Sequence, residues 1–371
     1  MPKSFSEKLA RSGQKKLLAC DGGGIRGVLS LRILKRVETL LREQAHDPAL
    51  VLADYFDYIA GTSTGAIIAA FLATGMDVDR IIEFYHQSGP AMFSRASLLK
   101  RFWYKYDDQA LSEELQQVFG KDTRLGDPAV RTLLMLVMRN ATTDSAWPVS
   151  NNPSGAYNES SRANCNLKLP LWQLVRASTA APSYFPPEQI QVGSSQFMFV
   201  DGGTTSFNNP AFQLFLMATA QPYHLQWQTG TDKMLLVSVG TGTTRASRPK
   251  LCETEMNLLY DASAVPTGLV DAAMVEQDVL CRTFGETVAG GELSRELGTM
   301  IGACGPISPK LFTYARYNTA LTSEALANLG LPDINPDDVR SMDSTDHLAE
   351  LEQIGDRVAD QQVQPSHFFP V

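Results

Sequence analysis

Two short apolar segments that each end in a glycine-rich turn limit this chain to few folds. Residues 16–20 (KLLAC) run into DGGGIRG, and residues 57–60 (DYIA) run into GTSTG. A segment with helical spacing of apolar residues follows the first turn, over 28–41, and an apolar helical segment follows the second, over 66–74. Short apolar strands that feed helices are typical of parallel sheets with helices on their faces. The sequence therefore predicts an α/β fold with a mostly parallel central sheet.

Three further apolar segments predict additional strands, over 132–138, 197–200 and 234–239. The motifs that carry chemistry extend from residue 21 to residue 203, so one large domain must contain them. We assign 16–320 to this domain, with its motif-bearing core at 16–245, and residues 1–15 to a polar N-terminal segment. A chain of 371 residues is long enough to bury a full hydrophobic core in such a domain.

The C-terminal residues 321–371 are predicted to form a helical, acidic extension that packs on this domain. Asn335 is a suitable helix N-cap, and Pro336 suits the first helical position. An apolar stripe follows among acidic neighbours and consists of Leu348, Leu351, Ile354 and Val358. We expect this stripe to face the domain.

The composition is that of an ordinary globular protein, with 44% hydrophobic and 19% charged residues and a net charge of −8. An acidic surplus speaks against binding to DNA, because nucleic-acid-binding proteins usually carry a basic surplus. No apolar run approaches the roughly 18 residues that a membrane helix needs. The N-terminus lacks the apolar region of a secretory signal. We therefore expect a cytoplasmic protein that contacts the inner membrane face at most peripherally.

The GTSTG turn at 61–65 matches the GxSxG pattern, in which a serine projects from a sharp turn between a strand and a helix. Gly61 and Gly65 allow backbone segments to approach where any Cβ would collide. The helix that follows would direct its N-terminal N–H groups toward developing negative charge. A structural turn rich in glycine and serine is the alternative. The position between a strand and an apolar helix favours Ser63 as a nucleophile.

The first glycine-rich turn, DGGGIRG, has two interpretations. Gly22, Gly24 and Gly27 satisfy GxGxxG, which would place a nicotinamide dinucleotide at this turn. Glu38 or Glu43 would then bind the ribose. A match of this kind is weak on its own, because three consecutive glycines and an arginine are unusual in that motif.

The other interpretation of this turn is an oxyanion hole. The N–H groups of Gly22, Gly23 and Gly24 would converge on the oxygen of a tetrahedral intermediate, where each donor contributes roughly 3–4 kcal/mol. Arg26 would hold this loop or add positive charge. Without the serine motif, the two interpretations are equally good.

A third motif, formed by Asp201, Gly202 and Gly203, follows the predicted strand 197–200 directly. A carboxylate at the end of a strand beside two glycines is well placed to face a shared crevice. Considered alone, an ordinary Asp-Gly turn is the better explanation.

The histidines decide how a serine nucleophile would be activated. The chain has five, at positions 46, 86, 224, 347 and 367, and none of them lies in a glycine-rich motif. His224 and His347 remain alternatives for the base of a triad. A carboxylate that touches the serine hydroxyl in a dry site is a sufficient base. We therefore predict a dyad of Ser63 and Asp201.

Together these motifs resemble those of the patatin-like phospholipases. DGGGIRG is similar to the oxyanion loop of that family, GTSTG to its nucleophile elbow, and DGG to the segment that holds the dyad aspartate. Supporting segments follow in the same order, at 177–182 (ASTAAP), 184–186 (YFP), 208–210 (NNP) and 238–242 (SVGTG). The resemblance covers roughly residues 16–245.

The resemblance implies a three-layer α/β/α fold and hydrolysis of fatty acyl esters, with membrane phospholipids as substrates. It implies that Ser63 attacks the ester carbonyl, that Asp201 accepts its proton, and that the glycine loop binds the oxyanion. It also implies that no cofactor and no metal ion take part. The five scattered cysteines, with no CxxC pair, do not suggest a metal site.

The N-terminus without a signal and the acidic tail also resemble bacterial patatin-like effectors of anti-phage defence, which a cyclic dinucleotide activates. Arg245, Arg248 and Lys250 near Tyr260 are the candidate surface for such a nucleotide. The alternative is a constitutive cytosolic acyl hydrolase or a thioesterase-like enzyme. The segment 98–106 (LLKRFWYKY) mixes basic and aromatic residues and would suit a lid or a membrane contact. An amphipathic segment at the edge of the core explains it equally well. An oligomer is compatible with the sequence.

Overall fold

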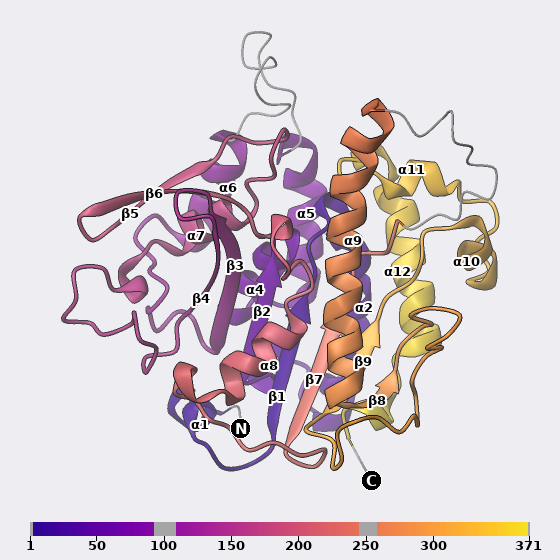
Figure 1. The fold of residues 1–371 in the computed structure, drawn as a ribbon, viewed down its shortest axis with the longest axis horizontal. Helices are drawn as coiled ribbons and strands as arrows, with labels where there is room; N and C mark the ends of the chain where they lie inside the picture. The colour runs from indigo at the N-terminus through magenta and orange to yellow at the C-terminus, as the bar shows by residue number, and fades with distance from the viewer. Residues whose placement is uncertain (1–2, 93–108, 245–257, 370–371) are drawn as a thin grey trace.

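A single sheet organises the computed structural model, which describes residues 3–92, 109–244 and 258–369 (Figure 1). Within these residues, nine strands form the sheet in the order β5-β6-β3-β2-β1-β7-β9-β8, and β4 also pairs with β3. The strands are β1 (Lys15–Cys20), β2 (Tyr58–Thr62), β3 (Leu133–Asn140), β4 (Ser145–Ser150), β5 (Glu188–Val192), β6 (Ser195–Asp201), β7 (Met234–Val239), β8 (Glu286–Ala289) and β9 (Thr313–Tyr317).

Most neighbouring strands are parallel. The run β3-β2-β1-β7-β9-β8 is parallel throughout, whereas the pairs β3–β4, β3–β6 and β5–β6 are antiparallel. The predicted α/β fold with a mostly parallel sheet is therefore confirmed. The antiparallel pairs all lie at one side of the sheet, and β6 ends there at Asp201.

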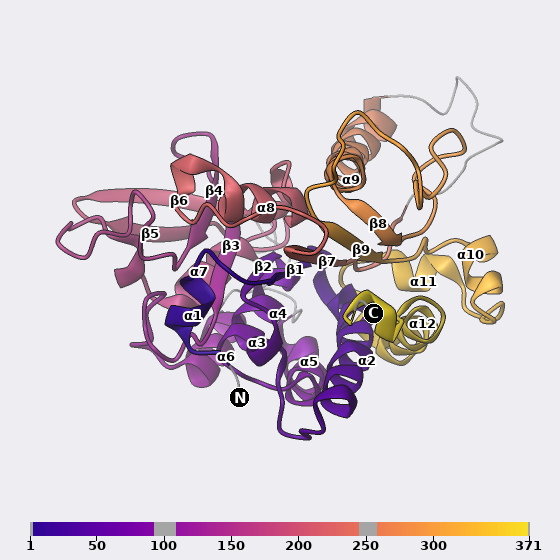
Figure 2. The same ribbon diagram turned by 90° about the horizontal axis from the view of Figure 1, so that it is seen from below.

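Helices cover both faces of the sheet, which gives three layers (Figure 2). One face carries α2 (Gly27–Ala45), α4 (Thr64–Ala73) and α12 (Leu348–Gln362), and the other carries α8 (Ala211–Thr219) and α9 (Leu258–Phe284). The other described α-helices are α1 (Phe5–Leu9), α3 (Leu52–Tyr55), α5 (Val78–Met92), α6 (Gln109–Phe119), α7 (Leu171–Ser178), α10 (Ser323–Asn328) and α11 (Pro336–Arg340). Within the described residues, no helix is long and apolar enough to cross a membrane.

Strand β1 shows why its sequence is apolar without interruption. Leu18 and Cys20 belong to the core on the α2 and α4 side of the sheet, whereas Leu17 and Ala19 belong to the core on the α8 side. All four side chains are fully buried. A strand that is covered on both faces has no position left for a polar side chain, so the alternation of a half-buried strand is lost.

The predicted strands are all present, as β1, β2, β3, β6 and β7. Strands β4, β5, β8 and β9 were not predicted, because their sequences SAWPVS, EQIQV, ETVA and TYARY contain no continuous apolar run. Strand β9 even contains an arginine, Arg316, whose side chain is buried.

The C-terminal part is helical, as expected from its apolar stripe. Leu351, Ile354 and Val358 of α12 are fully buried and pack with residues of α2. The Asn335 side chain caps α11 by accepting a hydrogen bond from the N–H of Asp337 at 3.2 Å. The division of the chain at residues 15/16 and 320/321 stays a prediction.

The contact between α12 and α2 requires a glycine at position 355. A Cβ there would lie 2.6 Å from the carbonyl oxygen of Leu29. We expect Gly355→Val to lower the free energy of unfolding by about 1–3 kcal/mol, because a side chain would force the helices apart. Urea unfolding measures this change. Gln353→Val, at an exposed position of the same helix, should cost about 0.5 kcal/mol or less, and equal losses would contradict the close contact.

Candidate active site

Ser63 occupies the sharp turn between β2 and α4. Its backbone has φ 55° and ψ −125°, a conformation that is uncommon for a residue with a side chain. Two backbone hydrogen bonds hold the turn: the N–H groups of Ala66 and Ile67 both donate to the carbonyl of Ser63. The Ser63 side chain is half-buried and therefore accessible. The GTSTG sequence thus forms a strained elbow that presents a hydroxyl group, as predicted from the motif.

The glycines of this elbow allow two backbone contacts that no side chain would permit. A Cβ on Gly61 would lie 1.9 Å from the carbonyl oxygen of Gly65, inside the turn. A Cβ on Gly65 would lie 2.2 Å from the carbonyl oxygen of Cys20, the last residue of β1. The second contact brings the elbow against the start of the DGGGIRG loop.

The register of the sheet brings Asp201 to the serine. Thr62 on β2 lies beside Val137 on β3, and Met138 on β3 lies beside Asp201 on β6. Ser63, one residue after Thr62, and Asp201 therefore flank the same level of β3. Because β6 is antiparallel to β3, Asp201 reaches this level at the end of its strand.

The two side chains form a direct hydrogen bond. The Ser63 hydroxyl donates to Asp201 Oδ2, and the two oxygen atoms are 2.6 Å apart. The other carboxylate oxygen, Oδ1, accepts the N–H of Gly203 at 2.6 Å. Burial raises the pKa of Asp201 to about 6, although the hydrogen bonds from Ser63 and Gly203 oppose this rise. A buried carboxylate with this pKa is ionised at neutral pH and can accept a proton.

The ASTAAP segment supports both members of this pair. Ser178 accepts the N–H of Ser63 at 2.9 Å and donates its own hydroxyl to the carbonyl of Val137. The carbonyl of Ala180 accepts the N–H of Asp201 at 2.9 Å. From the sequence, this segment was only one of the supporting segments of the family resemblance, and its contacts with both backbones come from the tertiary structure.

The N–H groups of the DGGGIRG loop have different partners, which corrects one prediction. The N–H of Gly22 donates to the carbonyl of Asn208 at 3.0 Å, so it anchors the loop and is not free to bind an oxyanion. Among the described residues, the N–H groups of Gly23 and Gly24 have no hydrogen-bond partner. These two amides remain as candidate oxyanion donors. Gly24 also needs its left-handed φ of 61°.

Arg26 braces the loop rather than reaching into solvent. Its Nε donates to the carbonyl of Gly23 at 3.2 Å, and its Nη1 donates to the carbonyl of Gly242 at 3.3 Å. Burial lowers the pKa of Arg26 to about 10, which leaves the guanidinium charged at neutral pH. The loop thus carries a fixed positive charge.

The dinucleotide interpretation of the loop finds no support in its surroundings. A Cβ on Gly27 would lie 2.5 Å from Thr64 Oγ1, so this glycine serves to pack α2 against the elbow. The Glu38 carboxylate is buried, accepts the N–H of Val78 at 3.3 Å and pairs with Arg42 at 3.1 Å. Glu43 is exposed on α2. The geometry therefore favours the oxyanion interpretation.

The glycines of the third motif also pack closely. A Cβ on Gly202 would lie 2.2 Å from the carbonyl oxygen of Val137, and one on Gly203 would lie 2.9 Å from Asn208 Oδ1. The turn after Asp201 can therefore fold back against β3 and the NNP segment only without side chains. This packing explains why two glycines follow the aspartate.

None of the five histidines, all of which lie in described parts of the chain, hydrogen-bonds to Ser63 or Asp201. Three of them have other partners, in the pairs His86–Glu352, His347–Glu350 and His367–Tyr317. No hydrogen bond therefore joins the alternatives His224 and His347 to Ser63 or Asp201. The carboxylate of Asp201 is the group in contact with the serine hydroxyl.

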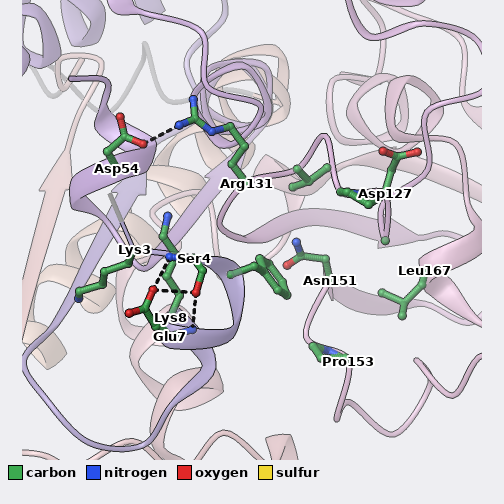
Figure 3. A pocket seen from close by; sticks show the side chains of 14 residues that line it. Lys3, Ser4, Glu7, Lys8, Asp54, Asp127, Arg131, Asn151, Pro153 and Leu167 are labelled. Atoms are coloured by element: carbon green, nitrogen blue, oxygen red, sulfur yellow. Dashed lines mark hydrogen bonds and ion pairs between the residues drawn. The ribbon is translucent and has the colours of Figure 1, made fainter. Parts of the chain in front are cut away.

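A cavity of about 620 Å³ (Figure 3) lies at the end of β2 and β3 that is remote from Ser63. It opens between α1 and the segments that precede β2 and β3. Its charged groups have partners nearby: Arg131 pairs with Asp54 at 2.7 Å, and Ser4 and Glu7 cap α1. Ser4, the serine that lines the cavity, does donate to the Glu7 carboxylate at 2.7 Å, but both side chains are exposed and form the cap of α1, unlike the buried Asp201 at the elbow.

Several predictions concern residues that the structure does not describe. The segment 98–106 and the basic residues Arg245, Arg248 and Lys250 lie outside the described residues, as does the side chain of Tyr260. Within the part of the chain that is described, no three His, Cys, Asp or Glu side chains are grouped as a metal site would need.

Comparison with known proteins identifies the family. A sequence model of the patatin-like phospholipases matches residues 18–215, which is more than half of the chain and includes the loop, the elbow and Asp201. The chain belongs to the patatin-like phospholipase family. Its sheet and helical layers are the α/β/α arrangement expected of a patatin-like protein.

Individual relatives in this family include plant patatins. Patatin-17 of Solanum cardiophyllum is 32% identical over 246 residues, which are 62% of this chain and 60% of that protein. Patatin-T5 of Solanum tuberosum is 31% identical over the same length. The similarity thus spans about 60% of the length of these relatives. The structure of VipD from Legionella pneumophila aligns with 92% of this chain and 67% of that chain, at 14% identity and a TM-score of 0.38, too low to support an argument.

The elbow glycine supplies a prediction that does not depend on activity. Gly61→Ala would place a methyl group against the Gly65 carbonyl, and we expect a loss of about 1–3 kcal/mol in the free energy of unfolding. Gly268→Ala is the matched control, because a Cβ on that α9 residue would meet no atom of the described residues within 4 Å. Chemical denaturation of both variants makes the comparison, and a Gly61→Ala variant as stable as the control would contradict the tight elbow.

Proposed function

We propose that this chain is a serine acyl hydrolase that uses Ser63 and Asp201 to release fatty acids from membrane phospholipids. One observation carries the proposal: the 2.6 Å hydrogen bond from the accessible Ser63 hydroxyl to the buried Asp201 carboxylate. Membership of the patatin-like phospholipase family supports the choice of a lipid acyl ester as substrate.

In the first half of the reaction, Ser63 Oγ attacks the carbonyl carbon of the ester while Asp201 Oδ2 accepts the hydroxyl proton. The carbonyl oxygen gains the negative charge, and the N–H groups of Gly23 and Gly24 are the donors proposed to bind it. The tetrahedral intermediate collapses, the ester C–O bond breaks, and Asp201 returns the proton to the leaving alcohol. The products are a lysophospholipid and an acyl group bound to Ser63.

In the second half, water replaces the alcohol. Asp201 accepts a proton from the water molecule as its oxygen attacks the acyl carbonyl carbon. The same N–H groups bind the second oxyanion. Collapse of this intermediate breaks the bond to Ser63 Oγ, which regains the proton from Asp201, and the fatty acid leaves. One carboxylate therefore acts as base and acid in each half of the reaction, and no histidine is required.

Finer aspects of the function stay predictions from the sequence. Activation by a cyclic dinucleotide, and with it a role in antiviral defence, rests on residues outside the described part of the chain. The constitutive acyl hydrolase or thioesterase-like enzyme remains the alternative. A cytoplasmic location, peripheral membrane contact and an oligomeric state likewise stay predictions.

The dyad predicts the effect of removing either side chain. We expect Ser63→Ala and Asp201→Asn to lower fatty-acid release from phosphatidylcholine vesicles by about 10³-fold or more, because each removes a group that acts in every bond-making step. Released fatty acid is measured by mass spectrometry, and the unfolding midpoint of each variant verifies that it is folded.

Two exposed positions supply matched controls for this experiment. Ser194→Ala and Asp122→Asn make the same chemical changes at the surface and should leave the rate unchanged. Undiminished hydrolysis in either dyad variant would overturn the mechanism. Hydrolysis of a soluble thioester with none of phospholipid would keep the dyad and replace the substrate class.

The raised pKa of Asp201 predicts a pH dependence. Asp201 must be ionised to accept the serine proton, and its pKa is raised to about 6. We expect kcat/KM for a soluble ester to be constant above this pH and to fall about tenfold per pH unit below it. Initial rates between about pH 4 and pH 8 test this. A midpoint near the ordinary aspartate value of about 4 would contradict a buried base.

A further inference from the structure

The oxyanion loop is held by residues that lie after the family-matched part of the chain. The match ends at residue 215. Beyond it, Thr241 Oγ1 donates to the carbonyl of Gly22 at 2.8 Å, and the carbonyl of Met342 accepts the N–H of Ile25 at 2.9 Å. Each contact fixes one side of the loop. A third contact fixes the beginning of the loop, at Asp21.

Asp21 forms a buried, two-pronged ion pair with Arg316 of β9. Nη1 of Arg316 donates to Oδ1 of Asp21 at 2.9 Å, and Nη2 donates to Oδ2 at 2.5 Å. Both side chains are almost completely removed from solvent. Burial alone would lower the pKa of Arg316, but the carboxylate of Asp21 raises it above the ordinary value, so the guanidinium stays charged.

The same guanidinium also connects the loop to the segment after the candidate base. Arg316 Nη1 donates to Ser238 Oγ at 2.7 Å, and Ser238 Oγ donates to Asn209 Oδ1 at 3.3 Å. The neighbouring residue, Asn208, is the one whose carbonyl binds the N–H of Gly22. Arg316 therefore binds Asp21, the residue before Gly22, and is linked through Ser238 to Asn209, the residue after Asn208. It supports the Gly22–Asn208 contact from both sides.

We propose that Arg316 is a positioning residue for the acyl-transfer reaction: it holds Asp21 so that the N–H groups of Gly23 and Gly24 face the oxyanion. This inference rests on the proposed function. Arg316 contacts neither Ser63 nor the substrate position, and it acts through Asp21 and Ser238. A planar guanidinium can bind both carboxylate oxygens of Asp21 and the hydroxyl of Ser238 at once, whereas the single ammonium group of lysine is not shaped for this.

A second buried ion pair in the same chain separates positioning from general stability. Arg282 donates to both oxygens of Asp278 at 2.9 and 2.8 Å, and both side chains are buried. This pair lies within α9, where Asp278 also accepts the Tyr314 hydroxyl at 3.0 Å and Arg282 also donates to two backbone carbonyls. Neither of its side chains makes a hydrogen bond to the oxyanion loop. It matches the Asp21–Arg316 pair in chemistry and burial, so its replacement is the control.

The experiment compares four full-length proteins: wild type, Arg316→Lys, the double variant Asp21→Asn/Arg316→Met, and the control Asp278→Asn/Arg282→Met. Replacing both partners avoids an unpaired buried charge, which would be far more destabilising than a neutral pair. For each protein we would measure kcat and KM on a 4-nitrophenyl ester, the unfolding midpoint, and the rate at which a fluorophosphonate labels Ser63. The labelling reaction forms a tetrahedral adduct and needs the oxyanion donors, but no acyl transfer to water.

We expect the Asp21/Arg316 double variant to lose about 10- to 100-fold in kcat and in labelling rate, with KM within about threefold of wild type. A misplaced donor weakens binding of the transition state more than binding of the substrate. Arg316→Lys should also have a lower kcat than wild type. The control should keep kcat within about twofold of wild type. Its unfolding midpoint should nevertheless fall by about as much as that of the Asp21/Arg316 double variant.

Two results would overturn the positioning role and leave the proposed function intact. One is a kcat within about twofold of wild type in both Arg316 variants. The other is an equal loss of kcat in the control, which would assign the effect to general destabilisation. Failure of the proposed function has a different signature, because wild type itself would then neither hydrolyse esters nor label at Ser63. The positioning role would fall with it.

Discussion

The site depends on a backbone contact between two turns, at the ends of β1 and β2. Gly65 lies so close to the carbonyl of Cys20 that a Cβ would be only 2.2 Å from that oxygen. This contact brings the DGGGIRG loop beside the serine elbow. The Ser63 hydroxyl and the amides of Gly23 and Gly24, which have no hydrogen-bond partner among the described residues, therefore lie at the same edge of the sheet. Such preorganised donors need no rearrangement when charge develops on an oxyanion. The strained φ of Ser63 persists because the elbow is held from both sides.

Burial determines the chemistry of the charged groups around this contact. Asp201 is almost completely buried, which raises its pKa toward the range of a useful base, while its hydrogen bonds keep it ionised at neutral pH. Arg26 is buried as well and holds the loop through two backbone carbonyls. Away from bulk water, these interactions are stronger than they would be at the surface, and side chains bound on several sides have little freedom to move. The charged side chains of Asp201 and Arg26 are therefore each held by two hydrogen bonds to their neighbours.

Sequence patterns predicted those strands whose own residues form a continuous apolar run. The strands β1, β2, β3 and β7 are buried on both faces, so each shows the apolar run that marks such a strand. The short strands β4, β5, β8 and β9 escaped prediction because polar residues interrupt them. Arg316 was missed for the same reason, although a charged residue inside the sequence TYARY was a signal that could have been followed. The role expected of the Gly22 amide was wrong because its partner, the Asn208 carbonyl, is almost two hundred residues away in the sequence.

Local sequence was enough to recognise the candidate reactive residues. Turn geometry and residue type are local properties, so GTSTG already favoured a projecting serine, and DGG indicated a carboxylate at the end of a strand once it was considered together with the other motifs. The contact between these two groups, in contrast, follows from the packing of the whole chain. Ser63 and Asp201 are 138 positions apart, and Asp21 and Arg316 are 295 apart. Both contacts follow from the order and register of strands across the sheet. Those depend on how the whole core packs, which no short segment encodes.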